Sequence, residues 1–292
     1  MPQVIYNLSF DEYCLIERMN PSTLVHGRTS MRALKYAMQG RTKEPTQAMQ
    51  FGNKYHSLIL EPEDFEQRFL VMPNFAASPE NVTAKGDKTD SWATTYAKES
   101  KRSFESMAFV DGKQVITREE YDRGLYMCES VMSDPYAAEI IKSSKREVTL
   151  LGEISGIEFK GRIDLCGDTV LADLKGTNKI DAIGFGNSCA NLKYAFKMAI
   201  YRELYRQNFD TNPEVAIIAI ETSAPFDCCV YDEMDAAIED GLDQALNTIT
   251  AYKNCLASGN WPGVNRGRRS VPLYVPNWAM PEDDLEVEYV PE

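Results

Sequence analysis

Residues 161 to 175 read GRIDLCGDTVLADLK, and this stretch decides the fold of the chain. Apolar residues alternate with polar ones on both sides of Gly167-Asp168. A Gly-X pair between two such runs is typical of a two-residue type II′ turn. We therefore expect a β-hairpin in which Cys166 pairs with Thr169.

Two acids and a lysine occupy this predicted hairpin. In the expected register, Asp164 lies opposite Leu171 and diagonally next to Asp173. Side chains alternate between the faces of a strand, so Leu171, Asp173 and Lys175 share one face of the second strand. The hairpin therefore gathers Asp164, Asp173 and Lys175 on one surface.

Neighbouring carboxylates repel each other unless a cation lies between them. A hard divalent ion such as Mg²⁺ takes oxygen ligands, typically one or two carboxylates together with waters and substrate phosphate. A lysine on the same face can hold that phosphate or help ionise an attacking water. The pattern indicates metal-dependent phosphodiester hydrolysis, and the alternative is a surface hairpin whose charges are solvated.

Composition narrows the class of protein. The chain has 292 residues, of which 43% are hydrophobic and 26% charged, as in ordinary soluble globular proteins. It has no apolar run of about 20 residues and no basic-then-apolar start, so we expect a cytoplasmic protein without membrane contact. Seven cysteines without C-x-x-C spacing argue against a disulfide framework. The net charge of -13 argues against a nucleic-acid coat protein, but not against a nuclease with a basic channel.

Capping boxes and apolar periodicity place the other elements. Ser9 to Glu12 and Thr117 to Glu120 are capping boxes, which start helices expected to end at Asn20-Pro21 and near Met132. Further helices are expected over 30–39, 46–60, 181–189, 192–206 and 235–256, and strands over 147–151, 158–165, 215–220 and 228–231. Residues 76–113 are polar and predict a long flexible loop or insertion with a short helix over 91–100.

We expect these elements to form a single domain over residues 1–292 that carries the predicted phosphodiester-hydrolysis site. Its predicted parts are a helical N-terminal region over 1–75 that carries His56, the loop or insertion over 76–113, a core over 114–256 and a C-terminal tail over 257–292. A histidine standing alone on a helix is usually a satisfied core residue, so His56 gains a functional interpretation only from its context.

Several short motifs, in this order and spacing, resemble the PD-(D/E)XK nuclease superfamily and, within it, the RecE-like exonucleases of phages and prophages. The resemblance runs over most of the chain. The matching segments are Met49-Gln50-Phe51-Gly52-Asn53-Lys54-Tyr55-His56, Leu60-Glu61-Pro62-Glu63-Asp64-Phe65, Lys160-Gly161-Arg162-Ile163-Asp164, Asp173-Leu174-Lys175-Gly176-Thr177 and Gly259-Asn260-Trp261-Pro262-Gly263.

The resemblance implies an α/β fold with a central mixed β-sheet flanked by helices. It also implies 5′ to 3′ exonucleolytic hydrolysis of double-stranded DNA ends. By position, His56, Asp164, Asp173 and the backbone carbonyl of Leu174 would bind Mg²⁺ or Mn²⁺, and Lys175 would orient the attacking water. Glu147 is an additional acidic candidate, and the alternative for it is a solvated strand end.

The same resemblance implies partners and DNA contacts. Relatives assemble as homo-oligomeric rings, work with a single-strand annealing protein in recombination, and act in the cytoplasm of a bacterial host when phage-encoded. Candidate DNA-binding residues are Arg162, Lys193, Lys197 and Tyr201. The chain departs from the family pattern at Lys197, where relatives often carry glutamine, and at Ile163, where the superfamily motif has proline.

Two other interpretations remain open. An iron–sulfur nuclease of the same superfamily would need four cysteines, and Cys14, Cys228, Cys229 and Cys255 fit the required spacing badly. A catalytically silent DNA-binding or regulatory protein would fit the acidic charge, but the acids and the lysine are intact. No G-x-x-x-x-G-K-[ST] loop is present, so we expect no use of ATP.

Overall fold

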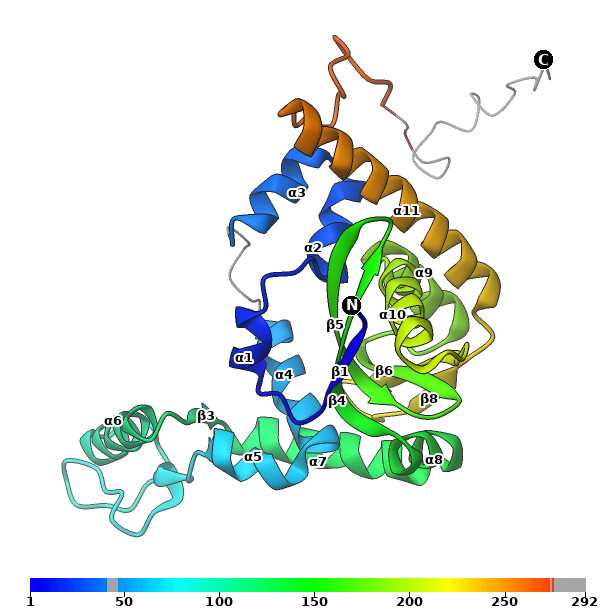
Figure 1. The fold of residues 1–292 in the computed structure, drawn as a ribbon. Coiled ribbons are helices and arrows are strands. Elements are labelled where there is room, and N and C mark those ends of the chain that lie inside the picture. Colours follow the sequence, from blue (N-terminus) through cyan, green and yellow to red (C-terminus); the bar gives the residue numbers. More distant parts are fainter. Residues whose placement is uncertain (41–46, 274, 276–292) are drawn as a thin grey trace, which may run out of the picture.

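The structure is a computed structural model that describes residues 1–40, 47–273 and 275. At its centre is a six-stranded sheet of order β1-β4-β5-β6-β7-β8 (Figure 1). β6 and β7 run parallel and the other neighbours are antiparallel, so the predicted mixed α/β sheet is confirmed. The strands are β1 (Gln3–Ile5), β4 (Lys145–Ile154), β5 (Ile157–Cys166), β6 (Val170–Thr177), β7 (Glu214–Glu221) and β8 (Cys228–Tyr231).

Helices cover both faces of the sheet, and each face has its own apolar core. One core contains Leu24, Phe159 and Phe196, and the other contains Tyr55, Met127 and Ile218. The first is covered by α2 (Pro21–Leu24), η1 (Val25–Arg28), α3 (Met31–Met38), α10 (Tyr194–Phe209) and α11 (Asp235–Ser258). The second is covered by α4 (Gln47–Leu60), α7 (Arg118–Ser133) and α8 (Pro135–Ser143), while α9 (Ala182–Leu192) packs on β7 through Phe185.

The predicted capping boxes start two helices. Ser9 caps α1 (Phe10–Leu15) and Thr117 caps α7, each accepting from the N3 backbone N–H while the N3 glutamate binds back to the cap. The first helix is shorter than expected, because it ends at Leu15 and Asn20 instead caps α2. α1 has no buried residue, whereas α7 buries one face.

The turn of the central hairpin differs from the predicted one. Cys166 pairs with Leu171 and not with Thr169, and the Gly167 N–H donates to the Val170 carbonyl at 2.9 Å. The turn is therefore centred on Asp168-Thr169, and Gly167 lacks the positive φ that a type II′ turn requires at its first central residue, so the type II′ prediction is wrong. In this register Asp164 falls directly opposite Asp173, so the hairpin brings the acids closer than a diagonal pairing would.

The alternation of side chains between the two faces of the sheet is interrupted in strand β5 at Asp164. Ile163 packs in the first core, whereas Leu165, two residues further on, packs in the second. On the neighbouring strand β4, Glu147 lies opposite Asp164 by register and has φ of +52°. Non-glycine residues rarely adopt this left-handed conformation, and such distortions often occur at functional sites.

The segment over 76–113 contains more structure than predicted. The helix α6 spans Thr95–Val110, so the expected short helix over 91–100 is wrong in extent. The loop before it is organised by Asn81, whose fully buried amide donates to three backbone carbonyls. With η2 (Phe75–Ala77), α6 projects away from the sheet, beyond α5 (Pro62–Arg68) and the parallel pair β2 (Phe69–Val71) and β3 (Gln114–Ile116) (Figure 1).

Parts of two predicted elements lie outside the described residues, namely Thr46 of the 46–60 helix, and residues 274 and 276–292 of the C-terminal tail. Within the described ranges, none of the helices has the length and apolar character needed to cross a membrane.

Candidate active site

The hairpin acids and the lysine meet at the edge of a cleft. The Nζ atom of Lys175 contacts the Oδ2 atom of Asp173 and lies 3.9 Å from the Oδ2 atom of Asp164. The Asp164 carboxylate also accepts the Leu174 N–H at 2.9 Å, where the backbone pairing of β5 with β6 ends. The structure therefore brings together the three charged residues that the sequence singled out.

His56 reaches the same cluster from α4. Its Nε2 atom lies 2.6 Å from the Leu174 carbonyl oxygen, and its Nδ1 atom lies 3.7 Å from Asp164 Oδ2. Burial and the nearby charge of Lys175 lower the pKa of His56 to about 4. The imidazole is therefore neutral at neutral pH, which is the form that binds metal ions.

Burial dominates the electrostatics of the acids. It raises the pKa of Asp173 to about 6, aided by Asp164 and opposed by Lys175. It also raises the pKa of Asp164. For Lys175, burial alone would lower the pKa, but the two carboxylates outweigh it and raise the pKa, so the amino group stays protonated. Asp164 and Asp173, when both are ionised, carry more negative charge than Lys175 alone can balance.

A further acid completes a set of metal donors. Single ligand atoms of His56, Glu147 and Asp164 lie within 4.8 Å of one another, and the Leu174 carbonyl is next to His56. The carboxylate and carbonyl oxygens of this set suit a hard divalent cation such as Mg²⁺ or Mn²⁺, and the imidazole nitrogen is a ligand more typical of softer transition metals. Glu147 belongs to this set. The Asp173 carboxylate contacts Lys175, and its role as a metal ligand stays a prediction.

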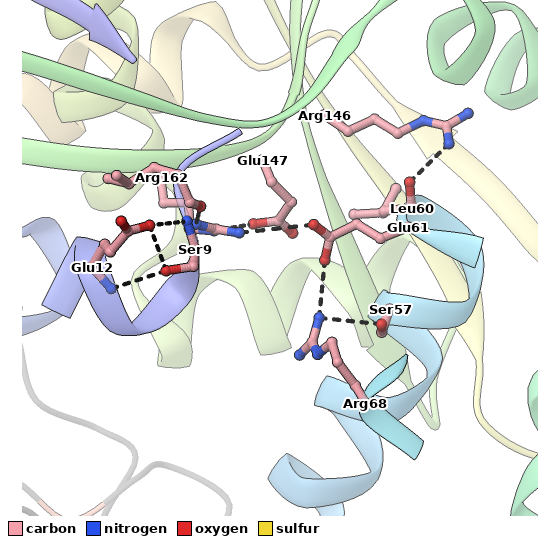
Figure 2. Close-up of polar contacts among 10 residues, drawn as sticks. Ser9, Glu12, Ser57, Leu60, Glu61, Arg68, Arg146, Glu147 and Arg162 are labelled. Carbon is pink, nitrogen blue, oxygen red and sulfur yellow. Dashed lines mark hydrogen bonds and ion pairs between the residues drawn. The ribbon is translucent and has the colours of Figure 1, made fainter. Parts of the chain in front are cut away.

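Arg162 joins three segments around Glu147, as Figure 2 shows. Its Nε atom donates to Glu147, its Nη1 atom donates to the Leu8 carbonyl at 2.6 Å, and its Nη2 atom lies 3.9 Å from Glu61 Oε1. Burial raises the pKa of Glu147, and the charge of Arg162 opposes this rise. The arginine thus links the N-terminal segment, β4 and the start of α5.

A cleft of about 660 Å³ opens over these groups. Of the predicted DNA-binding residues, Arg162 and Tyr201 line it. Lys197 is half-buried, with its Nζ atom 5.6 Å from the Tyr194 ring centre, and burial together with Lys175 lowers its pKa. Lys193 is exposed at the junction of α9 and α10 and does not line the cleft. Their roles in DNA binding stay predictions.

Lys160 comes from the same sequence motif as Arg162, and the structure places it in the cleft. It donates from Nζ to the Tyr13 carbonyl at 2.7 Å, and Tyr13 and Cys14, which the sequence did not single out as site residues, also line the cleft. Gly161 leaves room for the Tyr201 ring, because a Cβ atom there would lie 2.8 Å from that ring. A signal was present, since Lys160 and Arg162 are two residues apart on one strand and so share a face.

Comparison with known proteins identifies the family and finds a solved structure of similar fold. The family model described as a PDDEXK-like domain of unknown function (DUF3799) matches residues 22–266. A solved structure of a "putative exonuclease" from Eubacterium rectale has a TM-score of 0.60 at 16% identity, covering 93% of this chain and 97% of that one. A phage-related exonuclease from Haemophilus somnus 129PT covers 64% of this chain and 92% of its own, at 13% identity and a TM-score of 0.31, too low to support an argument.

No curated protein matches the chain. The family match extends over most of the 292 residues and includes the hairpin, His56 and Glu147, and the Eubacterium rectale structure shares the overall fold. The predicted PD-(D/E)XK fold is confirmed, and the RecE-like subgroup stays a prediction. The chain therefore belongs to the family of PDDEXK-like domains of unknown function, DUF3799.

Proposed function

We propose that the protein is a metal-dependent deoxyribonuclease that degrades double-stranded DNA from an end in the 5′ to 3′ direction. The observation that carries the proposal is the convergence of His56, Glu147, Asp164 and the Leu174 carbonyl beside a protonated Lys175 in one cleft. PDDEXK-like membership supports nuclease chemistry, and the resemblance to RecE-like exonucleases supports the direction and the duplex substrate.

The residues have separable roles. A divalent cation held by His56, Glu147 and Asp164 would supply a Lewis acid that lowers the pKa of water and balances phosphate charge. Lys175 is protonated, so it donates hydrogen bonds and cannot accept a proton. Asp173 contacts its amino group and fixes the direction in which that group points. The lysine therefore orients the water or the scissile phosphate and stabilises the charge that develops on the phosphate oxygens.

On the basis of the same resemblance, we also propose a role in DNA recombination. Digestion of one strand from each end would expose single strand of the other. A single-strand annealing protein could load on that strand during recombination, and a homo-oligomeric ring would keep the enzyme on its substrate. Mg²⁺ or Mn²⁺ is the proposed cofactor, and no ATP is required.

The first experiment uses linear duplex DNA labelled separately at its 5′ and 3′ ends. Wild-type protein, Lys175→Ala and Lys179→Ala are compared with Mg²⁺, with Mn²⁺ and with EDTA, and a covalently closed circle serves as a second substrate. Lys179 is an exposed lysine four residues beyond Lys175, so its variant controls for the loss of one positive charge.

We expect metal-dependent early release of the 5′ label from linear DNA by wild type and Lys179→Ala, an intact circle, and at least 100-fold slower release by Lys175→Ala. Cutting of the circle would instead show an endonuclease. No cutting with either metal would support a silent DNA-binding protein on the nuclease fold and would overturn the proposal.

A further inference from the structure

A second cavity adjoins the catalytic cleft. It measures about 650 Å³ and lies between the N-terminal segment, α5 and β4. Both cavities are lined by Phe10, Glu61, Arg68, Glu147 and Arg162, so the two spaces meet along the polar network of Figure 2. A polymer whose reacting phosphate lay in the cleft would have room to continue into this second cavity.

Two arginines of the second cavity donate hydrogen bonds from only one nitrogen of the guanidinium group. Arg146 donates from Nη1 to the Leu60 carbonyl at 2.8 Å, and Arg68 donates from Nη1 to Glu61 Oε2 at 3.0 Å and to Ser57 Oγ at 3.2 Å (Figure 2). Within the described part of the chain, their other nitrogens make no hydrogen bond. A fixed guanidinium with unused N–H donors suits a phosphate oxygen, which can accept more than one of them.

The acids that line the second cavity leave Arg146 without a partner. Glu61 pairs with Arg68, and Glu147 pairs with Arg162. Asp11 and Asp64 are exposed, as Arg146 is, and neither forms an ion pair with it. Arg146 therefore makes no ion pair with a described residue.

The rim shared by both cavities carries an aromatic ring. Phe10 is 60% exposed and lies on α1, a helix without a buried residue. The helix is nevertheless fixed at both ends by β5, because Arg162 binds the Leu8 carbonyl and Lys160 binds the Tyr13 carbonyl. The Phe10 ring stacks on Tyr13 with centres 6.3 Å apart. One apolar ring is thus positioned toward solvent at the junction of two polar cavities.

We propose that the second cavity binds one nucleotide adjacent to the scissile phosphate, with its backbone phosphate on Arg146 and Arg68 and its base stacked on Phe10. Every base has an aromatic face, so this contact would be tolerant of sequence. The inference rests on the proposed function, because it assigns the cavity to the same DNA strand.

The test measures DNA affinity over a series of salt concentrations. Lys175→Ala is the background, so that DNA stays intact in the presence of Mg²⁺, and binding of a duplex with a single-stranded end is followed by fluorescence anisotropy. Phe10→Ala and Arg146→Gln are compared with matched controls. Leu15→Ala removes an exposed apolar side chain of α1 that lines neither cavity, and Arg206→Gln removes an exposed, partly anchored arginine of α10.

The two contacts have different signatures. Phe10→Ala should weaken binding about 5- to 150-fold with an unchanged salt slope, since stacking contributes about 1–3 kcal/mol per base and releases no counterions. Phe10→Trp should restore binding. Arg146→Gln should lower the salt slope of log affinity by about 0.7 to 0.9, as expected for one lost phosphate contact. Both control variants should match the background protein.

The inference is overturned if Phe10→Ala binds as tightly as Leu15→Ala, or if Arg146→Gln keeps the full salt slope, in proteins with unchanged melting temperatures. Label release by the wild-type enzyme would leave the proposed function intact in that case. Absence of both binding and cleavage by wild type would instead overturn the proposed function, and this inference with it.

Discussion

At the scale of single residues, the proposed chemistry depends on the charged pair formed by Asp173 and Lys175. Asp173→Asn removes the charge that fixes the lysine, so we expect cleavage of linear duplex to fall at least 100-fold. DNA binding should survive or strengthen, because a negative charge beside the phosphate is lost. End-label release and anisotropy on the same protein separate the two effects. Near-normal cleavage by Asp173→Asn would show that the site is assigned wrongly.

Arg162 should also matter for stability. Its side chain is 13% exposed and that of Glu147 is 17% exposed, so Arg162→Met leaves a mostly buried carboxylate without its partner. Removing one member of a buried pair typically costs about 3–5 kcal/mol, so we expect a loss at the low end of that range in urea unfolding. The double variant Glu147→Gln with Arg162→Met should recover much of the loss. Equal stability of the double and single variants would contradict the argument.

The sequence predicted the residues of the site better than their contacts. Alternation placed Asp173 and Lys175 on one face, and both contact each other. The register of the hairpin could not be predicted, because a turn centred on Gly167-Asp168 and one centred on Asp168-Thr169 both fit the sequence, and the choice shifts the position of Asp164. The pairing of Arg162 with Glu147 depends on the register between β4 and β5. The two-residue turn Ser155-Gly156 sets that register, with a positive φ at both residues as a type I′ turn requires, and this local signal was not used in the sequence analysis.

Two helices with the same capping box allow a comparison at the scale of elements. Thr117→Ala should lower the free energy of unfolding by about 1 kcal/mol, because α7 buries Met127 and Val131 and must be formed in the folded state. Ser9→Ala should leave global unfolding almost unchanged, since α1 has no buried residue and contributes no side chain to either core. Urea unfolding of both variants tests this, and equal losses would contradict it.

The exposed thiol of α1 allows a second test of that helix. Cys14 is exposed and lines the catalytic cleft, whereas burial raises the pKa of Cys128 to about 12. The thiolate is the reactive form, so the raised pKa makes the Cys128 thiol much less reactive than an exposed one. A bulky maleimide should therefore modify Cys14 first and inhibit cleavage. Cys14→Ser should lose the fast labelling phase and keep its activity after treatment; inhibition of that variant would exclude Cys14 as the cause.

Local signals predicted most elements but not the extent of α6. The capping boxes and the β-branched run over 215–220 specify helix starts and a buried strand by short-range physics, and the structure has them. The region before α6 is polar, and its order comes from one side chain, Asn81, which binds backbone groups up to ten residues away. Such a contact leaves no periodic pattern in the sequence.

At the scale of the whole molecule, the acidic charge constrains how the protein could stay on DNA. A net charge of -13 gives no general attraction to phosphate, so repeated cleavage in one encounter requires that the substrate be enclosed. We therefore expect a homo-oligomer, whose mass in light scattering is a multiple of 33.0 kDa. Digestion should continue after unlabelled competitor DNA is added, because an enclosed strand cannot exchange. A 33.0 kDa species that the competitor stops at once would show a distributive monomer and contradict the ring.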